Sequence, residues 1–339
     1  MTLPETYIIQ KFYQFAGYPR YKKVANVYEA GCPICREGNS WGRKRRAYYI
    51  PQENVICCHN CGWYSNPIKW IMETGSLSYK DVVKEVSSED HQFQDVDTFT
   101  PTVNIEYDIP KLPHDSINLY DGIQVEYYKD NPVILSAMQY IKSRRLRFAV
   151  NSPSALYISL TDKIHKNRLC IPFQDASGDI VHYQTRTILD NTLDDVPKYL
   201  SKLGSDKTVY GVNNVSDIFP AIYIFEGPID SFFVENGVAI AGIQENSETS
   251  LTSAQEEMLG KFYYLKKIWV LDNQRNDPAS MKKTRKLITQ NEEVFIWPRN
   301  LSQFKDFNEM CVKYGLDEIS NTFIDKNTYK GRAAQLQLV

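Results

Sequence analysis

The sequence predicts a multi-domain α/β protein whose C-terminal half contains a parallel sheet. Over about residues 216–315, short apolar runs alternate with helical segments of similar length, which is typical of parallel strands joined by helices. Near the N-terminus, two Cys-x2-Cys motifs, Cys32/Cys35 and Cys58/Cys61, predict a separate small unit built around a metal. Between this unit and the parallel sheet, the sequence mixes helical and hairpin patterns, and we expect a mixed α+β part there.

The bulk composition indicates a soluble protein with room for two or three domains. Its 339 residues are 42% hydrophobic and 24% charged, which is ordinary for globular proteins. We find no apolar run long enough to span a membrane and no secretory signal pattern. Five of the seven cysteines lie within thirty residues, which favours metal binding in a reducing compartment over disulfides. With a net charge of −2, any contact with nucleic acid must come from local basic patches.

Residues 1–90 are predicted to form a zinc ribbon. The two cysteine knuckles flank strand-like runs such as Ala47–Ile50, and two knuckles on a short hairpin suit a tetrahedral Zn–S₄ site. The predicted zinc ligands are Cys32, Cys35, Cys58 and Cys61. Cys57 is an alternative to Cys58, and we expect His59 to face solvent or a base rather than the metal.

A basic cluster lies between the knuckles and is flanked by aromatic residues. It consists of Arg43, Lys44, Arg45 and Arg46. Cations that bind phosphates, beside rings that stack on bases, suit single-stranded nucleic acid. A solvated hairpin tip is the alternative, and zinc ribbons also bind proteins.

Residues 91–115 are acidic, polar and proline-containing, which predicts a linker. Residues 116–215 are expected to form a basic, mixed α+β part. An amphipathic helix is predicted at 131–147, and its basic end suits either phosphate binding or the helix dipole.

A hairpin is predicted at 168–188, turning at a Ser-Gly pair. On its second strand, His182, Gln184 and Arg186 share one face. We interpret this face as a nucleotide or template surface, with a plain solvent-facing side of a sheet as the alternative. Lys198, a little further on, adds a cation.

The elements within 216–315 follow from periodicity and capping signals. Besides the strand that precedes Glu226, the expected elements are strands at 238–242, 267–273 and 293–298 and helices at 253–260, 277–290 and 305–315. Ser253 and Glu256 have capping-box spacing. Residues 316–339 are expected to be a tail, with no clear element after about Thr328.

Acidic residues follow several of these strands. Glu226 ends the AIYIF strand, Asp272 ends the next central strand, and Asp306 opens the last predicted helix. Because right-handed crossovers bring the carboxyl ends of parallel strands to one edge, we expect these three acids to meet there. Asp230 lies one helical turn beyond Glu226 and either joins the site or stabilises a helix N-terminus.

Three clustered carboxylates repel one another unless a cation lies among them. Hard oxygen ligands suit Mg²⁺ or Mn²⁺, and such ions support phosphoryl transfer. Asp306 also has the spacing of a helix cap with Glu309, and one residue can serve both purposes.

These motifs together resemble DNA primases of the DnaG/Toprim kind, most of all those of T-even-type bacteriophages. The EGPID segment beginning at Glu226 matches the EGxxD signature, VLDN at 270–273 matches the start of the DxD motif, and KDFNE at 305–309 matches a later acidic segment. The resemblance covers roughly residues 31–69 and 168–315.

The resemblance implies an α/β enzyme with an N-terminal zinc ribbon, a mixed α+β basic subdomain and a parallel-sheet Toprim subdomain. Such an enzyme synthesises short RNA primers from ribonucleoside triphosphates on single-stranded DNA for lagging-strand replication. It implies structural Zn²⁺, catalytic Mg²⁺ or Mn²⁺, and a hexameric replicative helicase as partner in a primosome, with single-strand-binding protein as a further candidate. The expected location is the bacterial cytoplasm, that of the host if the protein is phage-encoded.

The resemblance also implies roles for individual residues. Glu226, Asp272 and Asp306 would hold catalytic metal, and Glu226 would also serve in acid–base chemistry. Asp230 is the last residue of EGxxD. Arg186 and Lys198 would contact phosphates. The second acid of DxD is absent, because position 274 is Gln274; Asp277 either replaces it or caps the helix at Pro278. The rival functions are a Toprim nuclease and a non-catalytic, helicase-loading adaptor.

Overall fold

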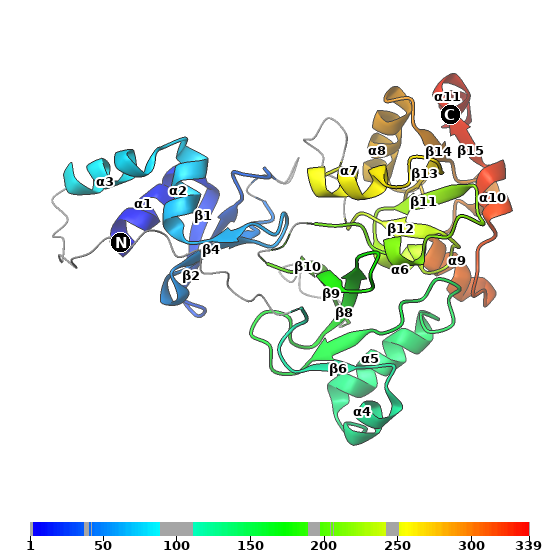
Figure 1. The fold of residues 1–339 in the computed structure, drawn as a ribbon, viewed down its shortest axis with the longest axis horizontal. Helices are drawn as coiled ribbons and strands as arrows, with labels where there is room; N and C mark the ends of the chain where they lie inside the picture. The colour runs from blue at the N-terminus through cyan, green and yellow to red at the C-terminus, as the bar shows by residue number, and fades with distance from the viewer. Residues whose placement is uncertain are drawn as a thin grey trace. The chain divides into compact units, whose positions relative to one another are not determined.

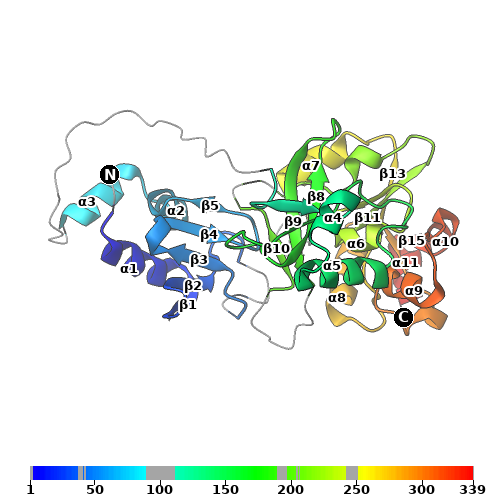
Figure 2. The ribbon, with the colours of Figure 1, turned by 90° about the horizontal axis from the view of Figure 1, so that it is seen from below.

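The computed structural model forms two compact units (Figures 1 and 2). The first consists of residues 1–110, 201–206 and 244–248, and the second of 111–200, 207–243 and 249–339. The structure describes residues 3–36, 41, 43–88, 111–188, 197–203, 205, 207–241 and 251–338. Within these ranges, no helix has the length and apolar character needed to cross a membrane.

The first unit is an antiparallel meander packed against helices. Its strands run in sheet order β1 (Gly17–Lys22), β2 (Val27–Gly31), β3 (Ala47–Ile50), β4 (Val55–Cys58) and β5 (Tyr64–Ser65). Its helices are α1 (Glu5–Phe15), α2 (Pro67–Gly75) and α3 (Tyr79–Ser88). Phe12 of α1 packs on Trp70 of α2, with ring centroids 5.5 Å apart, and both are buried beside Tyr49 of β3.

The second unit contains one antiparallel and one parallel sheet. The antiparallel sheet has the order β10 (Tyr199–Ser201), β9 (Ile180–Thr187), β8 (Arg168–Gln174), β7 (Tyr157–Ser159) and β6 (Ser116–Asn118). It is accompanied by helices α4 (Gly122–Tyr127) and α5 (Pro132–Ser143). The β8–β9 hairpin confirms the predicted one and turns through Gly178, whose φ of +85° is a conformation that glycine adopts readily.

The polar face predicted on β9 is largely buried, which contradicts the alternative of a plain solvent-facing side of the sheet. His182 is fully buried and Gln184 is only 6% exposed. The ring of His182 packs edge-on against Phe173, which lies directly across the hairpin, with centroids 5.1 Å apart. Phe173 also packs against buried Tyr210, with centroids 5.4 Å apart, so this face of β9 lies against a core rather than in water.

The parallel sheet has the order β12 (Gly237–Ala239), β11 (Ala221–Phe225), β13 (Lys266–Val270), β14 (Glu293–Phe295) and β15 (Thr328–Lys330). The first four strands are parallel, as predicted, and β15 is antiparallel. The helices of this part are α6 (Pro228–Ser231), α7 (Ser253–Gly260), α8 (Pro278–Thr289), α9 (Phe307–Tyr314), α10 (Asn321–Lys326) and α11 (Gly331–Leu338). The predicted capping box exists but starts one residue earlier, at Thr252, with Gln255 as its partner.

Both faces of this sheet are buried, as expected for parallel strands. Alternate residues of β11 point to opposite cores: Phe225 packs with Phe307 of α9, whereas Ile224 shares a cluster with Leu259 of α7 and Leu287 of α8. The central strands are therefore continuous apolar runs in the sequence, and polar residues occur at their ends.

We predicted no clear element after about Thr328, and this prediction was wrong. Strand β15 pairs with β14, matching Tyr329 to Val294, and α11 buries Ala334 against the same core as α8. A three-residue strand followed by a short helix carries too little periodicity to be recognised from sequence.

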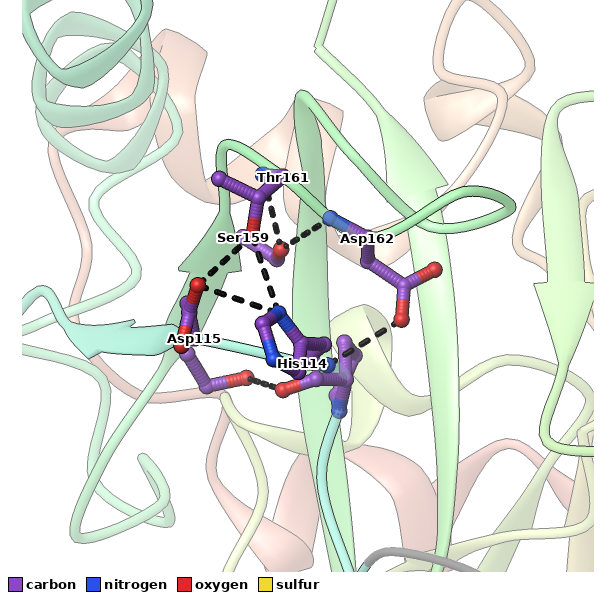
Figure 3. A network of polar contacts seen from close by, with 7 residues as sticks. His114, Asp115, Ser159, Thr161 and Asp162 are labelled. Atoms are coloured by element: carbon purple, nitrogen blue, oxygen red, sulfur yellow. Dashed lines mark hydrogen bonds and ion pairs between the residues drawn. The ribbon is translucent and has the colours of Figure 1, made fainter.

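A polar clasp joins the loop that precedes β6 to the loop that follows β7 (Figure 3). The backbone N–H of His114 donates to Asp162 Oδ2 at 3.0 Å, and Thr161 Oγ1 donates to Asp115 Oδ2 at 2.9 Å. Ser159 Oγ accepts from the Asp162 N–H at 2.9 Å. These bonds fix the path of the chain into the antiparallel sheet.

Candidate active site and metal centre

A small pocket lies at the carboxyl ends of β11 and β13, and all four predicted acids line it. Its volume is about 10 Å³, room for about one water molecule. The acidic lining residues are Glu226, Asp230, Asp272 and Asp306, and apolar side chains that include Trp297 and Phe307 complete the walls. The structure thus brings together acids that are far apart in the sequence.

Strand register explains why two of these acids are neighbours. Phe225 of β11 pairs with Val270 of β13, so Glu226 and Asp272 emerge from adjacent strands at the same edge. Ser280 Oγ on α8 donates to the backbone carbonyl of Asp272, which anchors the helix to this rim.

The other two acids are held by the start of α9. Asp306 is its N-cap and accepts from the Glu309 N–H at 2.8 Å. Asp230 Oδ1 accepts from the Asn308 N–H at 2.9 Å. Asp230 therefore stabilises a helix N-terminus, but that of α9 rather than that of its own helix α6.

The electrostatics of the pocket disfavour ionised acids. Burial, followed by the carboxylates of Glu226 and Asp306, raises the pKa of Asp272 to about 7. Burial, followed by Asp306 and Asp272, raises the pKa of Asp230 well above its usual value, although the Asn308 N–H opposes this. A cation in the pocket would relieve these repulsions.

The donor set consists of carboxylate oxygens and fits a hard cation such as Mg²⁺. Glu226, Asp272 and Asp306 would hold it. The oxygens of three of these acids do not all lie within 4.8 Å of one another. Among the described residues, only the cysteine cluster brings three or more candidate ligand atoms that close together.

Lys283 on α8 is a site residue that our sequence reasoning missed. Its Nζ forms an ion pair with Glu226 Oε1. The sequence carries no signal for this role, because only the contact of Ser280 with Asp272 shows that this face of α8 meets the rim.

Two residues near the motif have structural roles. Gln274 is buried, donates from Nε2 to the Phe295 carbonyl at 2.7 Å and accepts from the Trp297 N–H at 3.2 Å. Asp277 caps α8 by accepting from the Ala279 N–H at 2.9 Å. Neither lines the pocket.

The two predicted phosphate-binding cations lie in the electrostatic reach of the acids. Arg186 Nη1 donates to Tyr199 Oη, and its guanidinium lies 5.0 Å from the centroid of the Tyr199 ring and 5.7 Å from that of Tyr140. Burial lowers the pKa of Lys198, and Arg186 and Lys305 lower it further, while Asp306 and Asp272 oppose them.

The first unit contains the predicted metal centre. Cys32 Sγ lies 4.0 Å from Cys61 Sγ, and Cys35 Sγ lies 3.9 Å from Cys58 Sγ. A zinc tetrahedron with Zn–S bonds of about 2.3 Å has edges of roughly 3.8 Å, so the geometry fits structural Zn²⁺. Cys57 is buried outside this cluster, which decides between the two sequence alternatives.

Part of the basic cluster supports this centre. Asn60 donates from its backbone to Cys58 Sγ and from Nδ2 to Cys35 Sγ, both at 3.3 Å, and Arg46 Nη1 donates to Asn60 Oδ1 at 2.6 Å. Such outer contacts orient metal ligands. Arg45 donates to the Tyr18 carbonyl, and the remaining two members, Arg43 and Lys44, are exposed.

Comparisons with known proteins agree with the motifs. No family model matches the chain. The DNA primase of Enterobacteria phage T4 is 26% identical over 328 residues, covering 91% of this chain and 88% of that protein.

Solved structures similar to this chain include two bacterial primases. The zinc-binding and RNA polymerase domains of the Aquifex aeolicus primase are 17% identical, with a TM-score of 0.37 and coverage of 95% of this chain and 83% of that one. The E. coli primase catalytic core is 16% identical, with a TM-score of 0.43 and coverage of 64% and 82%. These scores are too low to support an assignment, but the sequence similarity to the phage protein extends over both units. The chain is therefore similar to a phage DNA primase over nearly its whole length.

Proposed function

We propose that this chain synthesises short RNA primers on single-stranded DNA for lagging-strand replication by metal-dependent nucleotidyl transfer. The observation that carries the proposal is the convergence of Glu226, Asp230, Asp272 and Asp306 on one pocket, in a chain similar to a phage DNA primase over nearly its whole length.

The reaction joins two nucleotides. The 3′-hydroxyl oxygen of one attacks the α-phosphate of the next, a new P–O bond forms, pyrophosphate leaves and the hydroxyl proton is lost. Bound Mg²⁺ or Mn²⁺ supplies charge that lowers the pKa of the hydroxyl and neutralises the pyrophosphate. Glu226 would accept the proton, and Arg186 and Lys198 would orient the triphosphate or template phosphates.

The zinc ribbon would contribute template binding. Arg43 and Lys44 are exposed and would contact phosphates, whereas Arg45 and Arg46 would act chiefly by shaping the segment that carries them. A hexameric replicative helicase is the proposed partner, with single-strand-binding protein as a further candidate.

The test uses full-length protein, single-stranded DNA, labelled ribonucleotides and Mg²⁺, with products resolved on a gel. Short RNA products are expected, and Glu226→Gln should abolish them without changing zinc content. Glu257→Gln, at an exposed position on α7, is the matched control and should leave synthesis unchanged.

Other outcomes separate the rival functions. Substantial synthesis by Glu226→Gln would sink the catalytic assignment. Degraded DNA without RNA would indicate the nuclease, and no product with DNA still bound would indicate the adaptor. A sharp rise in RNA on adding helicase would support the primosome partner.

A further inference from the structure

The ion pair between Lys283 and Glu226 is unusual in its location. The side chains are 17% and 29% exposed, respectively, so neither charge is freely solvated. Ion pairs on open surfaces contribute little because water screens them, but a partly buried pair beside other carboxylates interacts more strongly. Lys283 therefore changes the charge of the pocket itself.

The helix that carries Lys283 is fixed at the rim. Asp277 caps its first turn, and Ser280 Oγ donates to the carbonyl of Asp272. Lys283 follows Ser280 by three residues and lies on the same side of the helix. The ammonium is thus positioned by the same contacts that place Asp272 at the pocket.

The charge balance of the pocket differs from that of a site lined by acids alone. Four carboxylates line it, one of them is paired with an ammonium, and the neutral amide of Gln274 is bonded to β14. Its volume of about 10 Å³ leaves little room beside the acids. The ammonium of Lys283 therefore offsets part of the negative charge at the pocket.

We propose that Lys283 is a further positioning residue of this site, whose ammonium takes the place of one divalent ion at Glu226, so that the pocket binds a single Mg²⁺ or Mn²⁺. This inference rests on the proposed function. Lys283 would hold the Glu226 carboxylate in place through a charge-assisted hydrogen bond, and its fixed charge would favour the developing negative charge of the reaction.

Mn²⁺ binding to the zinc-loaded, full-length protein tests the inference without requiring catalysis. Free Mn²⁺ is measured by electron paramagnetic resonance, and ions lost in Asp272→Asn are assigned to the pocket. We expect one such ion in the wild type, one in Lys283→Arg, and two in Lys283→Met. Lys282→Met, which changes an exposed neighbour on the same helix, should bind one.

The Mg²⁺ dependence of primer synthesis gives a second readout. Lys283→Met should lose roughly tenfold or more of its rate at low Mg²⁺ and recover part of it at high Mg²⁺, with a steeper dependence on the ion. Lys282→Met should follow the wild type, and Lys283→Arg, which keeps the positive charge, should recover part of the loss seen in Lys283→Met. A lysine that only strengthened the fold would change thermal stability but not this dependence.

Two results would overturn the inference. One is a wild-type pocket that binds two Mn²⁺ ions, a result that needs no variant at Lys283. The other is a folded Lys283→Met with one Mn²⁺ and the wild-type Mg²⁺ dependence. If the wild type makes no RNA, the proposed function fails, while the Mn²⁺ count still decides the role of Lys283.

Discussion

Gln274 donates a 2.7 Å hydrogen bond from its side-chain amide to the backbone carbonyl of Phe295. The residue that stands in place of the second acid of the DxD motif is thus bonded to strand β14. Gln274 is only 3% exposed, and its Oε1 also accepts from the Trp297 N–H. Its amide satisfies one donor and one acceptor of the backbone, which a carboxylate cannot do.

Restoring an acid at this position should therefore fail to restore a metal ligand. Gln274→Glu removes the donor to Phe295 and buries a charge, so we expect a loss of about 1–3 kcal/mol in the free energy of unfolding. Chemical denaturation measures the loss, and Mn²⁺ counting should show no additional ion. Gln335→Glu, the same change at an exposed position on α11, is the control; an additional bound ion in Gln274→Glu would contradict this account.

Asp272 should make the metal-free protein less stable as pH rises. Its pKa is about 7 in the folded chain, compared with 3.8 for the exposed side chain in the unfolded chain. Between these values the folded state binds more protons than the unfolded state, so stability falls as pH increases from about 4 to about 7. Above pH 7 the full destabilisation is present.

Asp272→Asn removes this effect. At pH 8 without Mg²⁺, the variant should gain up to about 4 kcal/mol, because each pKa unit corresponds to about 1.4 kcal/mol. At pH 4 the gain should vanish, and adding Mg²⁺ should stabilise the wild type only. Urea denaturation at the two pH values measures the difference; equal gains at both would show that ionisation of Asp272 is not the cause.

Removal of zinc should unfold the first unit in particular. The four thiols are held together by the metal, and structural zinc contributes directly to folding. Cys35→Ser should therefore lower the zinc content and shift the tryptophan emission to longer wavelength as buried Trp70 becomes exposed. Cys57→Ser, a buried cysteine outside the cluster, should retain one zinc per chain; loss of zinc from both variants would contradict the ligand assignment.

The order of elements and the meeting of the acids could be predicted from sequence because both follow from local pattern and strand topology. Glu226 and Asp272 follow buried strands, and the parallel register brings such positions together. The spacing of the cysteines predicted the ligand set, and the structure decided between Cys58 and Cys57. The catalytic roles of the acids stay predictions until the variants are assayed.

The features that sequence reasoning missed depend on tertiary contacts. Lys283 looks like any basic residue on a helix, and only the packing of α8 against the rim brings it to Glu226. His182 lies on an alternating strand, but its ring is buried against Phe173 across the hairpin. Gln274 stands where the motif has an acid, and the motif alone could not predict that its side chain bonds to Phe295 of β14.

The pairing of β15 with β14 also has consequences for how the chain folds during synthesis. Strand β11 is made long before Thr328–Lys330, and until these residues emerge, the backbone groups of β14 that face β15 lack their partners. An unpaired strand edge is prone to join the edge of another chain. A chain that ends before β15 would therefore expose the edge of β14 in place of that of β15, although every acid of the pocket has already been made.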